Sequence, residues 1–349
     1  TPFARPGTAP PTPQPKGSTM RRTTTITGLS LAAALALSAC GGQQDRSGGE
    51  SGADESSCDA GQGRLNIATG NSTGVYYVVG GGLAKLVNDK TDLQATSAET
   101  GASVQNIQQV VSGDYDAGFS LADTASDAVA GKGDFKDKKA DVSTLGRIYS
   151  NYTHVVVSKK SGINSVKDFK GKTISTGSPK SGTEVIANRL IETSGLDLKD
   201  VKRQRLDLTK TVDGMKDGSI DGLVWSGGLP TPAITDLFTS MGDDVEFVDV
   251  TPQLGKMQEL NEVYEESTIP KATYDLDADV KTIAVPNVIV VRNDMPDNVA
   301  CAITKLMIDE KDALAQVHPA AKEIEPETMK ETGPIPLHPG SERALEETK

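Results

Sequence analysis

Residues 172–191 read KTISTGSPKSGTEVIANRLI and join a β-rich segment, a loop of small and polar residues, and the start of a helix. Ser181, Gly182 and Thr183 stand where that helix is expected to begin. The first turn of a helix leaves backbone N–H groups unpaired and carries the positive end of the helix dipole. The stretch therefore predicts a strand–loop–helix unit of an α/β fold, with a site for a small anion at the helix start.

The spacing from Gly177 to Gly182 comes close to that of a phosphate-binding P-loop. A P-loop needs Lys and then Ser or Thr directly after its second glycine, and here Thr183 and Glu184 follow instead. Because the lysine that would bind the β- and γ-phosphates is missing, we predict a pocket for a small carboxylate and not a nucleotide site.

The order of predicted elements occurs twice in the chain. The first copy runs from IATG at residue 67 to GDYDAG at residue 113, and the second runs from ISTG at residue 174 to GSIDG at residue 218. Each copy has the pattern β-α-β-α-β, which predicts parallel strands with right-handed crossovers. The alternative is a chance similarity of generic α/β sequence. Open α/β sheets bind ligands at the carboxyl ends of their strands, so two facing sheets would form a cleft.

Two β-branched runs, residues 147–159 and 282–292, are long enough to cross from one copy to the other. Two crossings predict that the second lobe is inserted into the first. We therefore expect lobe 1 to comprise residues 64–154 and 285–349, and lobe 2 to comprise residues 155–284.

The first 63 residues contain three segments of different composition. Residues 1–19 are rich in proline and are expected to be a disordered upstream segment. Residues 20–39 read as a secretory signal with an apolar run too short to cross a membrane, and LSAC at its end is similar to a bacterial lipobox. This predicts lipidation of Cys40 and an extracytoplasmic, membrane-anchored protein. An ordinary signal peptide with an accidental Cys is the alternative. Residues 40–63 are expected to be a flexible tether.

Charge and cysteine content limit the function further. Without residues 1–39 the formal charge moves from −12 to −16, because that segment has four basic residues and no acidic one. A nucleic-acid partner is not expected, since such proteins need a basic face. An anionic ligand would have to be held by local dipoles against the overall field. Cys58 and Cys301 are left after Cys40, and they either form a disulfide or stay as two thiols.

The chain resembles the TAXI family of solute-binding subunits of TRAP (tripartite ATP-independent periplasmic) transporters. The resemblance covers about residues 64–339 and rests on IATGNSTGVYYVVGGGLA, TGASVQNIQQVVSGDYD, FKGKTISTGSPKSGTEVIANRL, SIDGLVWSGGLPTPAI, IPKATY and TIAVPNVIVVR. It implies an α/β, two-lobe, periplasmic-binding-protein-like fold of type II (Venus flytrap) with two hinge crossings. The implied function is capture of a small carboxylate, such as a glutamate-like amino acid or a dicarboxylate, for delivery to a TRAP membrane permease. We expect a monomer.

The resemblance also implies which residues bind the ligand. In lobe 2 they include the helix start at residues 181–183. The full set is Asn71, Thr73, Gly74, Tyr76, Asn106, Ser181, Gly182, Thr183, Trp225, Gly227, Pro286 and Asn287. Asn106 is expected to point into the cleft, and Trp225 to face the cleft or else to lie in the core. The run Leu121–Ala122–Asp123 departs from the Gln-Ser-Asp of many relatives, which puts one polar ligand contact in doubt.

An enzyme is not expected from this sequence. The three histidines, His154, His318 and His338, fall in no nucleophile-elbow or zinc-protease pattern, and the cysteines lack CxxC spacing, so neither a catalytic nor a metal site is predicted. We expect no cofactor. The alternative function is a ligand-binding sensor or surface lipoprotein that signals to a membrane partner without transport.

Overall fold

The computed structural model describes residues 57–348 of the 349-residue chain. The expected signal segment, the lipidation site at Cys40 and most of the expected tether lie outside these residues. Within residues 57–348, no helix combines the length and the apolar character that a membrane crossing needs.

In residues 57–348 the strands join one ten-stranded sheet, in the order β2-β1-β3-β10-β4-β7-β5-β6, with β8 paired to β4 and β9 paired to β10. The strands are β1 Gly63–Ala68, β2 Leu93–Ala98, β3 Ala117–Leu121, β4 Val142–Ser158, β5 Thr173–Ser175, β6 Lys202–Gln204, β7 Gly222–Gly227, β8 Val245–Phe247, β9 Glu265–Ile269 and β10 Val280–Arg292.

The predicted repeat is visible in the pairing of these strands. In the first copy β1 pairs in parallel with β2 and β3, and in the second β5 pairs in parallel with β6 and β7. An antiparallel strand then flanks each set, β10 next to β3 and β4 next to β7. We call the elements around β1–β3 lobe 1 and the elements around β5–β7 lobe 2.

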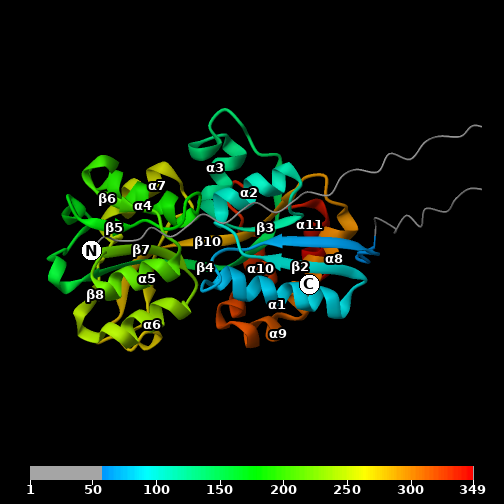
Figure 1. Cartoon of the computed structure of the whole chain (residues 1–349). Coiled ribbons are helices and arrows are strands. Elements are labelled where there is room, and N and C mark those ends of the chain that lie inside the picture. The colour runs from blue at the N-terminus through cyan, green and yellow to red at the C-terminus, as the bar shows by residue number, and fades with distance from the viewer. Residues whose placement is uncertain (1–56, 349) are drawn as a thin grey trace, which may run out of the picture. The chain divides into compact units, whose positions relative to one another are not determined.

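The two crossing strands, β4 and β10, run side by side from one lobe to the other (Figure 1). Their antiparallel register extends from Val142 opposite Arg292 to Tyr152 opposite Ala284, and it shifts on both sides of Val288. The expected lobe boundaries, at 154/155 and 284/285, fall inside these strands. The lobes are therefore joined by a paired ribbon and not by loose linkers.

Helices cover both faces of the sheet, with α1 and α2 on opposite faces in lobe 1 and α4 and α5 on opposite faces in lobe 2 (Figure 1). The helices are α1 Val75–Lys90, α2 Ser103–Ser112, α3 Ala122–Ala130, α4 Gly182–Thr193, α5 Leu208–Asp217, α6 Pro232–Met241, α7 Leu254–Leu260, α8 Asp297–Asp309, α9 Lys311–Val317, α10 Pro326–Met329 and α11 Pro339–Glu347.

The glycines at residues 80–82 lie inside α1 and do not end it. A Cβ atom at Gly80 would lie 2.5 Å from Thr69 Cγ2 and 3.1 Å from Phe119 Cε2. Close packing of α1 on the sheet therefore explains the absence of a side chain at this position.

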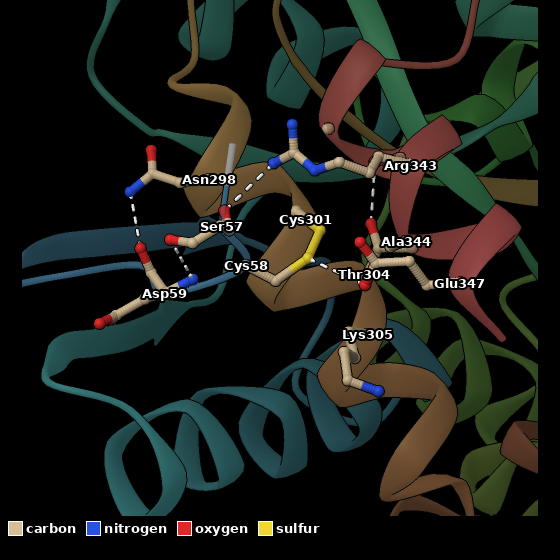
Figure 2. The surroundings of a disulfide bond; sticks show 12 residues. Ser57, Cys58, Asp59, Asn298, Cys301, Thr304, Lys305, Arg343, Ala344 and Glu347 are labelled. Carbon is tan, nitrogen blue, oxygen red and sulfur yellow. Dashed lines mark hydrogen bonds between the residues drawn. A yellow bond between two sulfur atoms is a disulfide. The ribbon is translucent and has the colours of Figure 1, made fainter. Parts of the chain in front are cut away.

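The end of the expected tether is fixed to lobe 1. Cys58 forms a disulfide with Cys301 of α8, with 5.0 Å between their Cα atoms. Figure 2 shows that flanking bonds support this junction: Asn298 Nδ2 donates to the carbonyl of Asp59 at 2.7 Å, and Arg343 donates to the carbonyl of Ser57 at 3.2 Å. A covalent bond and hydrogen bonds to backbone carbonyls therefore hold residues 57–59 of the expected tether to lobe 1.

Candidate functional site

A cavity lies between the two lobes, at the carboxyl ends of β1, β3 and β7. Its lining contains no charged side chain. The lining residues are Gly70, Asn71, Gly74, Val75, Tyr76, Gly101, Ala102, Ser103, Leu121, Asn151, Ser181, Gly182, Thr183, Trp225, Ser226 and Gly227. The volume of the cavity is about 30 Å³, about two to three times the minimum that one water molecule needs.

Three helices begin at this cavity. The residues before their first turns are Gly74 for α1, Ala102 for α2 and Ser181 for α4, and all three line the cavity. Neither α1 nor α2 has an acidic residue in its first turn or a side chain that caps it. Helix starts carry N–H groups without intrahelical partners and partial positive charge. In the first turn of α2, Gln105 N already donates to the carbonyl of Lys180 at 3.1 Å.

The start of α4 is capped from within lobe 2. Ser181 Oγ accepts a hydrogen bond from Glu184 N at 3.0 Å. The carboxylate of Glu184 accepts from Lys180 N at 2.8 Å and also pairs with Arg205. Because these groups engage Glu184, and because Glu184 does not line the cavity, its charge is not presented to a ligand there.

Two asparagines at the cavity are oriented by fixed bonds to their amide oxygens. Asn71 Oδ1 accepts from Leu208 N at 3.1 Å, which joins lobe 1 to the start of α5 in lobe 2. Asn151 Oδ1 accepts from Asn287 Nδ2 at 2.8 Å. Each carbonyl oxygen is therefore already engaged by protein.

Of the two adjacent tyrosines, Tyr76 lines the cavity and Tyr77 is exposed to solvent. The hydroxyl of Tyr76 donates to Asn287 Oδ1, and Asn287 Nδ2 also donates to the carbonyl of Tyr149 at 3.0 Å. Burial raises the pKa of Tyr76 well above its ordinary value, so this phenol stays neutral.

Eight of the twelve predicted ligand-binding residues line the cavity together. They are Asn71, Gly74, Tyr76, Ser181, Gly182, Thr183, Trp225 and Gly227. Trp225 is also part of a buried apolar cluster, and its Nε1 donates to Thr231 Oγ1 at 3.2 Å, so it both packs in the core and contacts the cavity.

Asn106 does not point into the cavity, contrary to the prediction. It is fully buried in lobe 1, and its Nδ2 donates to the carbonyls of Thr69 at 2.7 Å and Phe119 at 2.8 Å. Its Oδ1 accepts from Thr100 Oγ1 at 2.6 Å. The amide therefore stabilises backbone at the ends of β1 and β3, which is a structural role.

Three other predicted residues also lie outside the lining. Asn287 is behind it and positions Asn151 and Tyr76. Thr73 has its Oγ1 3.4 Å from Thr209 Oγ1 of the other lobe. Pro286 lines a separate surface hollow that also contains Arg147.

Three polar residues of the lining were not predicted from the sequence: Ser103, Asn151 and Ser226. Ser103 ends the TGAS segment, and the predicted ligand contact was Asn106 on the helix after it. Asn151 interrupts a β-branched run, and Ser226 directly follows the single Trp. A polar residue inside a strand-forming run was the available signal in both cases.

A buried ionic cluster also joins the lobes near the cavity. Arg189 of α4 donates to Asp123 Oδ2 at 2.9 Å and to Tyr264 Oη at 2.8 Å, and it pairs with Asp127 of α3. Burial opposes the charge of Arg189, but Asp123, Tyr264 and Asp127 raise its pKa above its ordinary value. Burial raises the pKa of Asp127 in spite of Arg189. Among residues 57–348, no group of three or more His, Cys, Asp and Glu side chains is arranged to hold a metal.

Comparison with known proteins gives a family and a fold. The model of the NMT1-like family matches residues 67–348. A solved structure of a protein from Bordetella bronchiseptica RB50 is similar at 19% identity, covering 81% of this chain and 88% of that one with a TM-score of 0.51. A binding protein component of an ABC phosphonate transporter from Pseudomonas aeruginosa is similar at 12% identity, covering 74% and 79% with a TM-score of 0.50. These likenesses show the α/β two-lobe fold of periplasmic binding proteins.

Proposed function

Because this chain belongs to the NMT1-like family and has the two-lobe fold of periplasmic binding proteins, we propose that it is an extracytoplasmic solute-binding protein. It captures a small anionic solute between its lobes and delivers the solute to a membrane transporter. It does not transform the solute chemically.

The observation that carries this proposal is the meeting of three helix starts at one uncharged cavity. The N–H groups at such starts bind anions without a basic side chain. They also act at short range, so they function in a chain whose formal charge is −12. Binding to both lobes stabilises the closed arrangement, because only that arrangement makes both sets of contacts.

The finer proposal is that the solute is a small carboxylate, a glutamate-like amino acid or a dicarboxylate, and that the partner is a TRAP-type permease driven by an ion gradient. The resemblance of the sequence motifs to the TAXI family supports this choice. The likeness to the Pseudomonas aeruginosa protein supports the alternatives of a phosphonate ligand and an ABC-type partner.

The proposed location is outside the cytoplasm, with a lipid anchor on Cys40. The disulfide between Cys58 and Cys301 supports an oxidising compartment. Metabolic labelling with a palmitate analogue, with Cys40→Ser as the control, tests the anchor.

A ligand screen tests the function. Thermal shift and calorimetry on the full chain with succinate, glutarate, glutamate, aspartate and methylphosphonate are expected to give a hit among the carboxylates. Ser181→Pro and Thr183→Glu are expected to abolish that binding and to leave the circular dichroism spectrum unchanged. A screen without any hit would rule the proposal out.

The transporter partner is tested by uptake in cells. Deletion of this chain is expected to stop uptake of the bound carboxylate. With a TRAP-type partner, uptake stops when the ion gradient is collapsed with an ionophore and persists when ATP is depleted at constant gradient. The opposite pattern identifies an ABC-type partner.

A further inference from the structure

The cavity offers no partner for a positively charged group on a ligand. None of its sixteen lining residues is charged. Of the acidic groups on the elements around the cavity, Asp123 and Asp127 pair with Arg189, and Glu184 pairs with Arg205. Glu99 is exposed to solvent outside the lining and accepts from Ser72 N at 2.9 Å. A buried ammonium group without a carboxylate partner is strongly disfavoured.

The neutral polar groups at the cavity are also poorly suited to an ammonium group. The amide oxygens of Asn71 and Asn151 already accept bonds from Leu208 N and Asn287 Nδ2. Thr183 Oγ1 accepts from Ser226 N at 3.2 Å, and Ser181 Oγ accepts from Glu184 N at 3.0 Å. A hydroxyl that accepts from a backbone N–H still has its own proton to donate. These side chains therefore still have protons to donate, while each of their oxygens already accepts one bond, which favours a ligand rich in acceptors.

The side-chain hydroxyl of Ser226 is a further polar group at the cavity without a partner among the described residues. Its side-chain oxygen is buried and has no hydrogen-bond partner among residues 57–348, and the residue lines the cavity. Buried polar atoms are rarely left unpaired in native structures, so an unpaired atom at a binding cavity indicates a bond made by the ligand. Ser226 lies at the end of β7, next to the start of α4 through its bond to Thr183.

We infer that this cavity selects small carboxylates that carry no ammonium group, and that the Ser226 hydroxyl donates to the bound carboxylate. This selectivity rests on the proposed function and narrows its ligand class. The cavity binds dicarboxylates and simple organic acids and rejects the corresponding amino acids. A zwitterionic amino acid would lose the hydration of its ammonium group and receive no counter-charge.

Matched pairs of ligands test the selectivity. Calorimetry on the full chain compares glutarate with glutamate, succinate with aspartate, and propionate with alanine, so that the members of each pair differ by one ammonium group. The ammonium-free member of at least one pair is expected to bind 30-fold or more tightly than its amino acid. Equal or tighter binding of the amino acids would overturn the inference and leave carboxylate binding in place. No binding by either member of any pair would overturn the proposed carboxylate class together with this inference.

Ser226→Ala tests the residue, and Thr153→Val is its matched control. Thr153 lies directly opposite Ser226 in the β4–β7 ladder, and its hydroxyl is also buried without a partner among the described residues, but Thr153 does not line the cavity. Ser226→Ala is expected to weaken binding of the preferred carboxylate 10-fold or more, and Thr153→Val is expected to change it less than 3-fold. Unchanged affinity in a folded Ser226→Ala protein, or equal losses in both variants, would overturn the role of Ser226.

Discussion

At the scale of single residues, Gly182 shows how closely the lobes approach each other. A Cβ atom there would lie 2.5 Å from Leu121 Cδ1 and 2.6 Å from Ser103 Oγ, both of lobe 1. Such distances are shorter than real Cβ atoms show, so the glycine allows the start of α4 to reach its position over the cavity. The requirement is steric, because Gly182 begins a helix with ordinary backbone angles and has no positive φ.

Gly182→Ala is therefore expected to hinder closure without unfolding either lobe. Overpacking of this kind costs about 1–3 kcal/mol, which corresponds to a loss of affinity of roughly 5-fold to 150-fold. Calorimetry with the carboxylate found in the screen measures the change. Gly255→Ala in α7, where an added Cβ meets nothing within 4 Å, is the control and should bind as the wild type does. Wild-type affinity in Gly182→Ala would show that the bound lobes are further apart than in this structure.

His154 gives the chain a pH dependence of stability. Its Nδ1 donates to the carbonyl of Tyr152 and its Nε2 accepts from Tyr274 Oη, both at 2.8 Å, and burial lowers the pKa of His154 to about 4. The unfolded chain, with an ordinary pKa near 6.5, therefore binds a proton at pH 5 that the folded chain does not. His154 contributes its full stabilisation above about pH 6.5, and this is lost as pH falls towards 4.

The expected loss between pH 8 and pH 5 is about 2 kcal/mol from this residue. Urea unfolding of the wild type and of His154→Phe at both values measures it, since the variant removes the titrating group and the other acid-sensitive groups remain. The unfolding free energy of the variant should fall by about 2 kcal/mol less than that of the wild type. An identical decrease in both proteins would assign the pH dependence to other groups.

At the scale of elements, the sequence predicted the framework better than the site. Apolar periodicity and capping residues are local signals, so several elements could be predicted from them. These are the strand at residues 93–98, the helix start after Ser181 and both crossing strands. The direction of Asn106 could not be predicted, because a polar side chain on a helix either faces a cavity or bonds to a neighbouring carbonyl. Asn151 was not predicted because its direction depends on how β4 pairs with β10. Its partner in that register, Val285, is 134 positions away in sequence.

The contact between α3 and α4 depends on one arginine. The side chain of Asp123 is fully buried, and that of Arg189 is 13% exposed, so removal of the arginine would leave a carboxylate without its counter-charge in the closed arrangement. Breaking a buried pair in this way costs about 3–5 kcal/mol. Because α3 belongs to lobe 1 and α4 to lobe 2, part of this cost falls on closure.

Arg189→Gln is thus expected to weaken ligand binding by roughly 100-fold. Lys216→Gln is the comparison, since it removes an ion pair with Asp236 that lies within lobe 2 and on its surface, where such pairs contribute little. Calorimetry on both variants should show a large loss only for Arg189→Gln. If both bind as tightly as the wild type, the cluster does not stabilise the bound form.

At the scale of the whole chain, a strand pair and a disulfide link distant parts of the sequence. The β4–β10 ribbon joins the lobes through paired backbone, so their relative motion requires bending or twisting of two hydrogen-bonded strands. The disulfide joins residues that are 243 positions apart and so closes most of the chain into a ring. A cross-link over such a long loop restricts the unfolded chain strongly and stabilises the fold by about 3–5 kcal/mol.

Reduction of this disulfide is expected to lower the Tm by roughly 5–15 °C. Calorimetric scans with and without reductant measure the change in the wild type. The double variant Cys58→Ser/Cys301→Ala should melt at the lower temperature in both conditions. Thiol titration shows whether the reductant has opened the bond. If the bond is open and the Tm of the wild type is unchanged, the cross-link does not provide this stability.

The position of that bond also decides which lobe carries a mechanical load. Cys58 precedes β1 and is attached to α8 of lobe 1, so a pull applied to the chain ahead of Cys58 is transmitted to a helix and not to the first ladder of the sheet. With the proposed anchor ahead of Cys58, lobe 1 would be the lobe attached directly to that anchor. Tension on such an anchor would act on the disulfide and α8, and not on the residues that line the cavity.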